Sequence, residues 1–159
     1  AHKLITDTEG NILWLSKECG SNGCIATVDV SYPSMPLYLL YNPELVKGMM
    51  RPILKFARMP IWGYDFAPHD AGRYPILTGQ VYSARKRAKH QAMGAMHAPY
   101  YLYPASADAY ALGKQMPVEE CGNMLLCVAA VCKAKNSTEY AEKHLDIHLT
   151  ALYQYLELA

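Results

Sequence analysis

The chain has 159 residues, of which 18% are charged, and a formal net charge of +1. A charge this low and balanced creates no strong field of one sign, so nucleic acid is not expected as a partner. The length suits one domain, and the absence of an uninterrupted apolar run of about 18 residues argues against a membrane span.

The first half of the chain predicts a lead-in followed by two helices. Residues 4–15 place a Gly-Asn turn before a short apolar run, which is typical of an irregular lead-in or a small hairpin. The prolines at the front of the apolar run 32–41 fit the entry of a helix. Asn42 and Pro43 then supply an N-cap and a first helical position for a second helix, with a kink at Pro52. Because almost nothing separates the two helices, we predict an antiparallel helical hairpin.

Residues 59–80 predict a long ordered loop. The segment contains three prolines, three glycines and four aromatic residues, so it can sustain neither a helical nor a strand period. Its polar side chains gather in His69, Asp70 and Arg73, which are flanked by stiff neighbours. Long loops inside compact domains commonly carry function, so these three residues are candidates for a site.

The second half predicts a long apolar helix that begins at Pro117, with Glu119 and Glu120 in its first turn. Residues 125–131 are apolar on nearly every face, which indicates a helix packed between other helices. Asn136 is then expected to be the N-cap of a last helix that continues to the end of the chain. Residues 83–97 could form a helix whose basic face is solvated.

The five cysteines are odd in number and show no CxxC spacing, which argues against zinc-ribbon and thioredoxin sites. Whether Cys19 and Cys24 are bridged stays open. These features together predict a single all-α domain over residues 1–159, built from antiparallel helical hairpins with long ordered loops.

Four blocks of the sequence resemble a known family, in the family's order and over most of the chain. The blocks are Ser21-Asn-Gly-Cys-Ile-Ala-Thr-Val-Asp-Val-Ser-Tyr-Pro-Ser34, Tyr41-Asn-Pro-Glu-Leu45, Phe66-Ala-Pro-His-Asp-Ala-Gly-Arg-Tyr-Pro75 and Met116-Pro-Val-Glu-Glu-Cys-Gly-Asn-Met124. They resemble the central domain of the glutaminase A family. The resemblance implies part of an (α/α)6 toroid within a larger protein, with other domains as partners. It also implies an extracellular or periplasmic location and hydrolysis of glutamine to glutamate and ammonia.

The candidate catalytic residues lie inside these blocks. Amide hydrolysis needs activated water, a proton donor for departing ammonia and groups that stabilise the oxyanion. No Gly-x-Ser-x-Gly elbow or Ser-x-x-Lys is present, so carboxylate-assisted attack of water is the scheme that remains. One carboxylate among Asp70, Glu119 and Glu120 would act as base. A second carboxyl with a raised pKa, or His69, would act as acid.

Asp29, Arg73 and Asn123 are candidates for binding or orienting the substrate. The same carboxylates would also suit a glycoside hydrolase, with a cleft walled by aromatic residues such as Trp62 and Tyr74. A non-catalytic scaffold or carbohydrate-binding fragment is a third interpretation.

We expect no cofactor and no metal ion, because His69, Asp70 and Glu119 show no diagnostic ligand spacing. All the catalytic interpretations share one structural expectation. The acidic start of the Pro117 helix and the His69 segment should meet at the same place.

Overall fold

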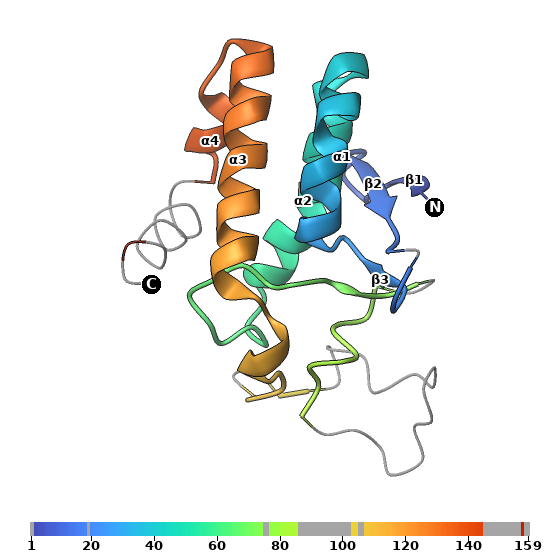
Figure 1. Cartoon of the computed structure of the whole chain (residues 1–159), viewed down its shortest axis with the longest axis vertical. Coiled ribbons are helices and arrows are strands. Elements are labelled where there is room, and N and C mark those ends of the chain that lie inside the picture. The colour runs from blue at the N-terminus through green and yellow to red at the C-terminus, as the bar shows by residue number, and fades with distance from the viewer. Residues whose placement is uncertain are drawn as a thin grey trace.

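The computed structural model describes residues 2–18, 20–74, 77–85, 103–104, 107–144 and 157. Its elements in chain order are β1 (His2–Thr6), β2 (Ile12–Ser16), β3 (Cys24–Ile25), α1 (Val28–Tyr41), α2 (Pro43–Ala57), β4 (Gly72–Arg73), a 3-10 turn (Leu112–Lys114), α3 (Pro117–Lys135) and α4 (Glu139–Glu142) (Figure 1). The fold is mostly helical, as predicted. The structure also contains two small two-stranded sheets, β1–β2 and β3–β4, so the fold is not purely α-helical as predicted.

Helices α1 and α2 form the predicted hairpin, joined by a single residue. Asn42 caps α2 by accepting a hydrogen bond from the backbone N–H of Glu44 at 3.0 Å, and Pro43 occupies the first helical position. Helix α1 begins earlier than predicted, at Val28, so Pro33 lies inside it. Helix α3 packs against both members of the hairpin. The starts of α1 and α3 and the end of α2 form the lower ends of the helices in Figure 1, above the loop segments.

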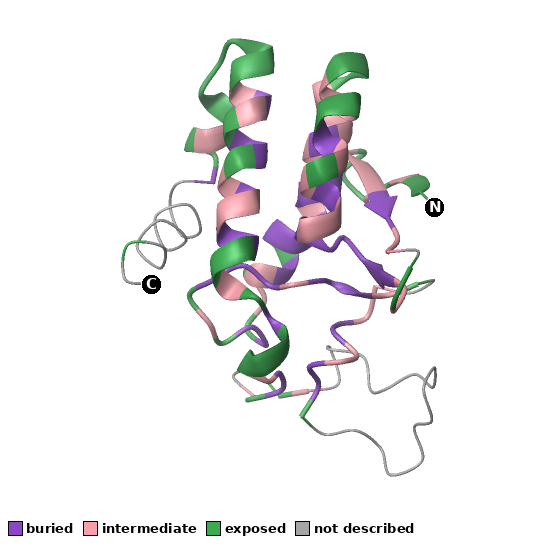
Figure 2. Cartoon of the chain, viewed as in Figure 1, coloured by how far each residue is buried: buried purple, intermediate pink, exposed green. Residues whose placement is uncertain are grey.

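The buried side chains of α2 and α3 supply much of the core (Figure 2). Met50, Ile53 and Leu54 on α2 and Met124 and Val131 on α3 are each exposed by 2% or less. The sequence predicted that α3 is packed between other helices on nearly every face, but one of its faces is exposed. Leu126 is 51% exposed in the structure, although its apolar neighbours in sequence suggested a buried environment.

The N-terminal hairpin packs on α2 at a position that only glycine fits. Strand β1 pairs with β2 in antiparallel register, from His2 opposite Ser16 to Thr6 opposite Ile12. A Cβ atom built on Gly48 would lie 3.0 Å from the backbone nitrogen of Trp14 and 3.1 Å from the carbonyl oxygen of Ile12. The absence of a side chain at residue 48 therefore sets the spacing between α2 and β2.

We expect Gly48→Ala to lower the free energy of unfolding by about 1 kcal/mol. Overpacking against backbone costs roughly 1–3 kcal/mol and is partly offset by the better helix propensity of alanine, about 1 kcal/mol. Gly122→Ala in α3 is the matched control, because nothing lies within 4 Å of its added Cβ atom. That variant should gain stability in urea unfolding, and a loss of equal size in both variants would contradict the packing argument.

Strands β3 and β4 tie the long loop to the start of α1. Cys24 pairs with Arg73 and Ile25 pairs with Gly72, so the loop is held by backbone hydrogen bonds that were not predicted. A second link joins Ala84 to Tyr110 as an isolated bridge. The loop therefore crosses beneath the helix ends in a defined position.

The predicted N-cap at Asn136 is wrong. Asn136 ends α3 instead, in the left-handed conformation with φ 47°, which asparagine tolerates better than most residues. Helix α4 begins at Glu139, whose N–H donates to the Ser137 hydroxyl at 3.2 Å. The rest of the predicted last helix and most of the predicted basic helix lie outside the described residues.

Glu44 joins α2 to the far end of α3. Its carboxylate lies 2.8 Å from Lys135 Nζ, 2.9 Å from Lys47 Nζ and 3.4 Å from Arg51 Nη2. Partial burial acts to raise the Glu44 pKa, but hydrogen bonds and charge from Lys135 and Lys47 outweigh it and lower the pKa to about 2.

Stability is expected to fall as the pH drops from about 4.5 towards about 2. A carboxyl whose folded pKa lies below its unfolded value stabilises the fold above the unfolded pKa, 4.5, and loses this contribution as it protonates in the folded state. The contribution of a partly exposed, salt-screened network is about 1 kcal/mol or less. Thermal unfolding of wild type and Glu44→Gln, measured from pH 7 down to pH 2, determines this contribution to stability. The two pH profiles should differ most at neutral pH and converge near pH 2, and parallel profiles would contradict the assignment.

Candidate functional site

Three segments far apart in sequence bring ionisable side chains together at the end of the molecule where α1 and α3 begin. Asp29 lies in the first turn of α1, Glu120 lies in the first turn of α3, and His69 comes from the long loop. One ligand-type atom from each residue lies within 4.8 Å of the other two. His69 Nε2 is 4.0 Å from Glu120 Oε1. We call Asp29, His69 and Glu120 the acidic cluster.

Both helices of the cluster start directly after strained backbone. Met116, the residue before Pro117, has φ 48°, and Ala26, two residues before α1, has φ 58°. Neither helix has a side-chain hydrogen bond at its N-cap, and the positive ends of two helix dipoles face this region. Left-handed non-glycine residues cost free energy and often occur at functional sites.

Asp70 fixes the orientation of His69. Its Oδ2 lies 2.9 Å from His69 Nδ1, and its Oδ1 accepts a hydrogen bond from the Gly72 N–H at 2.9 Å. Burial acts to lower the His69 pKa, but the hydrogen bond and charge of Asp70 outweigh it, so the pKa is raised. With Nδ1 turned to Asp70, Nε2 is the nitrogen that faces Glu120.

Two buried glutamines hold the His69–Asp70 backbone. Gln80 and Gln115 are 0% exposed and exchange two side-chain hydrogen bonds, at 2.9 and 2.7 Å. Gln115 Oε1 also accepts from the His69 N–H at 3.2 Å, and Gln80 Nε2 donates to the Asp70 carbonyl at 3.1 Å. Sequence reasoning missed both residues, because glutamine is usually exposed and no local motif marks this pair.

Glu120 is the most perturbed acid of the cluster. It is 0% exposed, and neither carboxyl oxygen has a hydrogen-bond partner. Burial, followed by the charges of Asp29 and Glu119, raises the Glu120 pKa to about 9, so the group is neutral at pH 7. Burial also raises the pKa of Asp29, against an opposing effect of His69. The cluster thus holds a neutral carboxylic acid beside a second carboxyl group whose pKa is also raised.

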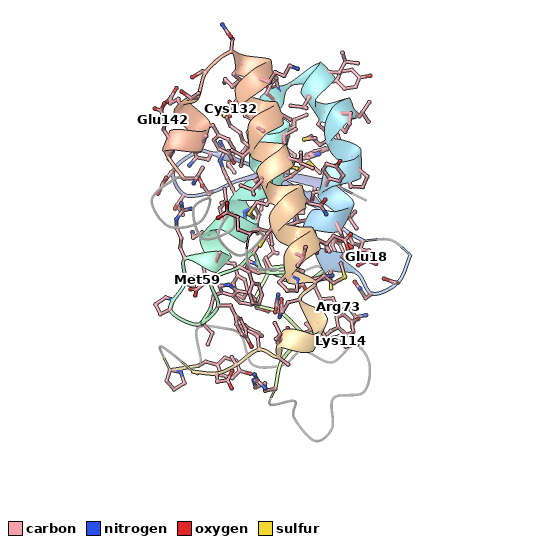
Figure 3. All side chains as sticks on the ribbon, turned by 60° about the vertical axis from the view of Figure 1, so that its left-hand side comes forward. Glu18, Met59, Arg73, Lys114, Cys132 and Glu142 are labelled. Carbon is pink, nitrogen blue, oxygen red and sulfur yellow. The ribbon has the colours of Figure 1, made fainter. Side chains whose placement is uncertain are left out.

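The other predicted site residues are more scattered. Glu119 is exposed, while Asn123 is half-buried in the next turn of α3. Arg73 is half-buried on β4, and Figure 3 shows it near the end where α3 starts. Tyr74 is 50% exposed, with Lys17 Nζ 5.4 Å from its ring centre.

Trp62 belongs to the aromatic core and does not stand as an open wall. It is 7% exposed, and its indole N–H donates to the Phe66 carbonyl at 2.9 Å. Its ring contacts Phe56, Tyr64 and Tyr110 at centroid distances of 5.1 to 6.1 Å. The predicted aromatic cleft between Trp62 and Tyr74 therefore does not have Trp62 as an exposed face.

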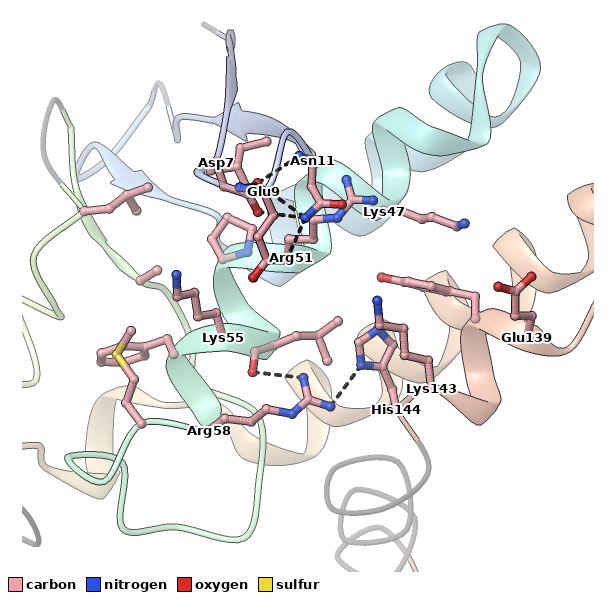
Figure 4. A pocket seen from close by; sticks show the side chains of 18 residues that line it. Asp7, Glu9, Asn11, Lys47, Arg51, Lys55, Arg58, Glu139, Lys143 and His144 are labelled. Carbon is pink, nitrogen blue, oxygen red and sulfur yellow. Dashed lines mark hydrogen bonds between the residues drawn. The ribbon is translucent and has the colours of Figure 1, made fainter.

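The two described cavities do not include the acidic cluster. A cavity of about 490 Å³ lies between the β1–β2 turn, α2 and α4 (Figure 4), and one of about 280 Å³ lies beside Tyr64 and Tyr110. Some of the polar groups that line the larger cavity are hydrogen-bonded to one another. Arg58 Nη2 lies 2.9 Å from His144 Nδ1, and Asp7 accepts hydrogen bonds from Asn11. The acidic cluster reaches the surface through His69 and Asp29, which are half-buried.

Fold and site together define a helical-hairpin domain with carboxyl groups and a histidine gathered where two helices start. Among the described residues no helix has the length and apolar character needed to cross a membrane. The chain belongs to the glutaminase A family, since the family's six helical-hairpin domain matches residues 1–158.

Two fungal proteins are similar to the chain. It is 30% identical over 144 residues to "Glutaminase A" of Aspergillus oryzae, covering 90% of this chain and 17% of that protein. It is 32% identical over 120 residues to a protein named "Probable glutaminase" of Arthroderma benhamiae, covering 75% and 11% respectively. The chain thus spans less than a fifth of the length of these relatives. No solved structure matches it.

Proposed function

We propose that this domain carries a hydrolytic centre for the side-chain amide of L-glutamine, with the acidic cluster as its core. The observation that supports this most is the meeting of three family blocks, through Asp29, His69 and Glu120, around one small space. Both similar proteins are named as glutaminases, and that name implies a small-molecule substrate.

The chemistry follows from the different protonation of the two carboxyl groups. Asp29 takes a proton from water, whose oxygen attacks the amide carbon. Glu120, kept neutral by burial and by the nearby acid, gives its proton to the amide nitrogen as the carbon–nitrogen bond breaks and ammonia leaves. His69, held by Asp70, places positive charge beside the developing oxyanion. The exposed Glu119 has no part in this scheme.

Hydrolysis of glycosides is the alternative. The ligand-type oxygens of Asp29 and Glu120 lie within 4.8 Å. This separation is shorter than the roughly 6.5–9.5 Å between the two catalytic carboxyl groups of inverting glycosidases. It is closer to the roughly 5–5.5 Å found in retaining glycosidases. If the cluster acted on sugars, it would therefore act with retention.

The test measures ammonia release from L-glutamine beside a panel of glycosides, with the protein that carries this domain. We expect ammonia release that Asp29→Asn lowers by about 10²-fold or more, as for the loss of a general base. Glycoside cleavage without ammonia release, or an Asp29→Asn variant of wild-type activity, would contradict the proposal.

The surroundings of the domain are part of the same proposal. Helical hairpins with their starts at a shared end fit a segment of an (α/α)6 ring, with the acidic cluster facing the ring's interior. Further hairpins and domains of a longer, secreted chain would then complete the walls of the substrate site.

A further inference from the structure

The acidic cluster has the donor atoms and the spacing of a cation site. Asp29 and Glu120 offer one carboxylate oxygen each and His69 offers Nε2, all within 4.8 Å of one another. Zinc binds such atoms at about 2.0–2.2 Å, so tetrahedral ligands lie roughly 3.3–3.5 Å apart. Side-chain rotations that move each donor atom by about 1 Å would bring the three donors to these distances.

Unpartnered oxygens are the second observation that points to a ligand. Glu120 is 0% exposed, yet neither of its carboxyl oxygens has a hydrogen-bond partner, and Asp29 Oδ1 is also buried without one. Buried polar atoms in native proteins are almost always paired, coordinated or bound to water. A cation between Asp29 and Glu120 would satisfy these oxygens and would let both groups be carboxylates without mutual repulsion.

His69 is already prepared as a ligand. Its Nδ1 faces Asp70 Oδ2 at 2.9 Å, so Nε2 faces the cluster and can act as a ligand when the imidazole is neutral. Metal-binding histidines almost always donate their other N–H to a carboxylate or carbonyl, which fixes the ring and makes the ligand more basic. Asp70 has this position here, and the Gly72 N–H holds Asp70 in turn.

We propose that Asp29, His69 Nε2 and Glu120 bind one divalent cation of the zinc class. An imidazole nitrogen with two carboxylates suits zinc better than calcium or magnesium, which prefer oxygen donors throughout. The cation would occupy the same atoms of Asp29 and Glu120 that exchange protons in the proposed hydrolysis, so the two uses of the site exclude one another. The cation would therefore inhibit the acid–base hydrolysis proposed above.

Calorimetric titration of chelator-treated protein with ZnCl₂ tests the site. We expect one zinc ion per chain. Glu120→Gln should weaken binding by at least about 100-fold, because loss of a direct ligand exceeds the loss of an outer partner. Asp70→Asn should weaken binding by about 10- to 100-fold. Glu119→Gln removes the same charge one residue away on the exposed side and should bind as wild type does.

Circular dichroism of each variant checks that the fold is intact, and chemical shifts of the His69 ring report on its coordination. An absence of zinc binding to wild type, equal affinity of Glu120→Gln and wild type, or tighter binding of CaCl₂ than of ZnCl₂ would overturn the proposal. Ammonia release measured on the chelator-treated, zinc-free samples separates the two proposals, because bound zinc would itself suppress the reaction. Zinc binding by a protein that releases no ammonia when free of zinc refutes only the glutaminase function, and Glu120-dependent hydrolysis without zinc binding refutes only the cation site.

Discussion

Glu120→Gln is expected to lower kcat for glutamine hydrolysis by about 10²- to 10⁴-fold, the usual contribution of a general acid. The glutamine side chain introduced at position 120 has nearly the shape of the neutral glutamic acid side chain, but it has no acidic proton to transfer to the substrate. Because the Glu120 pKa is about 9, the wild-type side chain is uncharged at pH 7, and the substitution changes little in local charge. The free energy of unfolding should therefore stay within about 1 kcal/mol of wild type.

The neighbouring Glu119→Gln is the control for this prediction. Both substitutions remove a carboxyl from the first turn of α3, but Glu119 is exposed and Glu120 is not. Steady-state ammonia release should separate them clearly, with Glu119→Gln close to wild type. Equal losses in both variants would indicate an effect on the helix start and would remove Glu120 from the mechanism.

Gln115→Leu is expected to have the largest effect on stability, a loss of about 2–4 kcal/mol. The substitution leaves the buried His69 N–H unpaired, which costs roughly 1–3 kcal/mol, and removes one hydrogen bond from each end of the Gln80 amide, each worth about 0.5–1.5 kcal/mol. The Gln80 amide keeps its bonds to the Asp70 carbonyl and the Ser83 hydroxyl. Gln80→Leu should act similarly. Once one of the two glutamines has been replaced, replacing the other should lower the free energy of unfolding by a smaller amount.

A double-mutant cycle in urea unfolding tests this pairing. The double variant should be less destabilised than the sum of the single variants, with a coupling energy of about 0.5–3 kcal/mol. Lys114→Leu, an exposed substitution next to Gln115, should change stability by no more than about 0.5 kcal/mol. Strict additivity would show that the two amides act independently.

The helix starts were predictable because their signals are local. Asn42 and Pro43 at the start of α2, and Pro117 at the start of α3, need only their neighbours in sequence to act. The N-terminal hairpin was one of two interpretations for the same reason, since its turn and apolar run are adjacent. Asn136 shows the limit of this reasoning. An asparagine can cap either end of a helix, and the side that it serves depends on the chain's direction after it.

Long-range contacts could not be read from local patterns. Strands β3 and β4 are two residues long, too short for a period, and their pairing depends on how the loop crosses the helix ends. Trp62 looked like a cleft residue because its loop is rich in proline and glycine, but packing against other rings buries it. The proximity of Glu120 and His69 was expected from chemistry. The proximity of Asp29 to both of them, within 4.8 Å, came only from the packing of α1 beside α3.

Helix α3 is attached at both extremities, and this limits how the site can adapt to a substrate. Near its start the Ala67 N–H donates to Cys121 Sγ at 3.5 Å, and near its last turn Lys135 bonds to Glu44 of α2. Contacts at both ends oppose translation of α3 along its axis and tilting of α3 about either end. Glu120 is thus carried on a helix that is tied to the long loop at one end and to α2 at the other, and we expect adjustment during a reaction to come mainly from rotamer changes of the surrounding side chains.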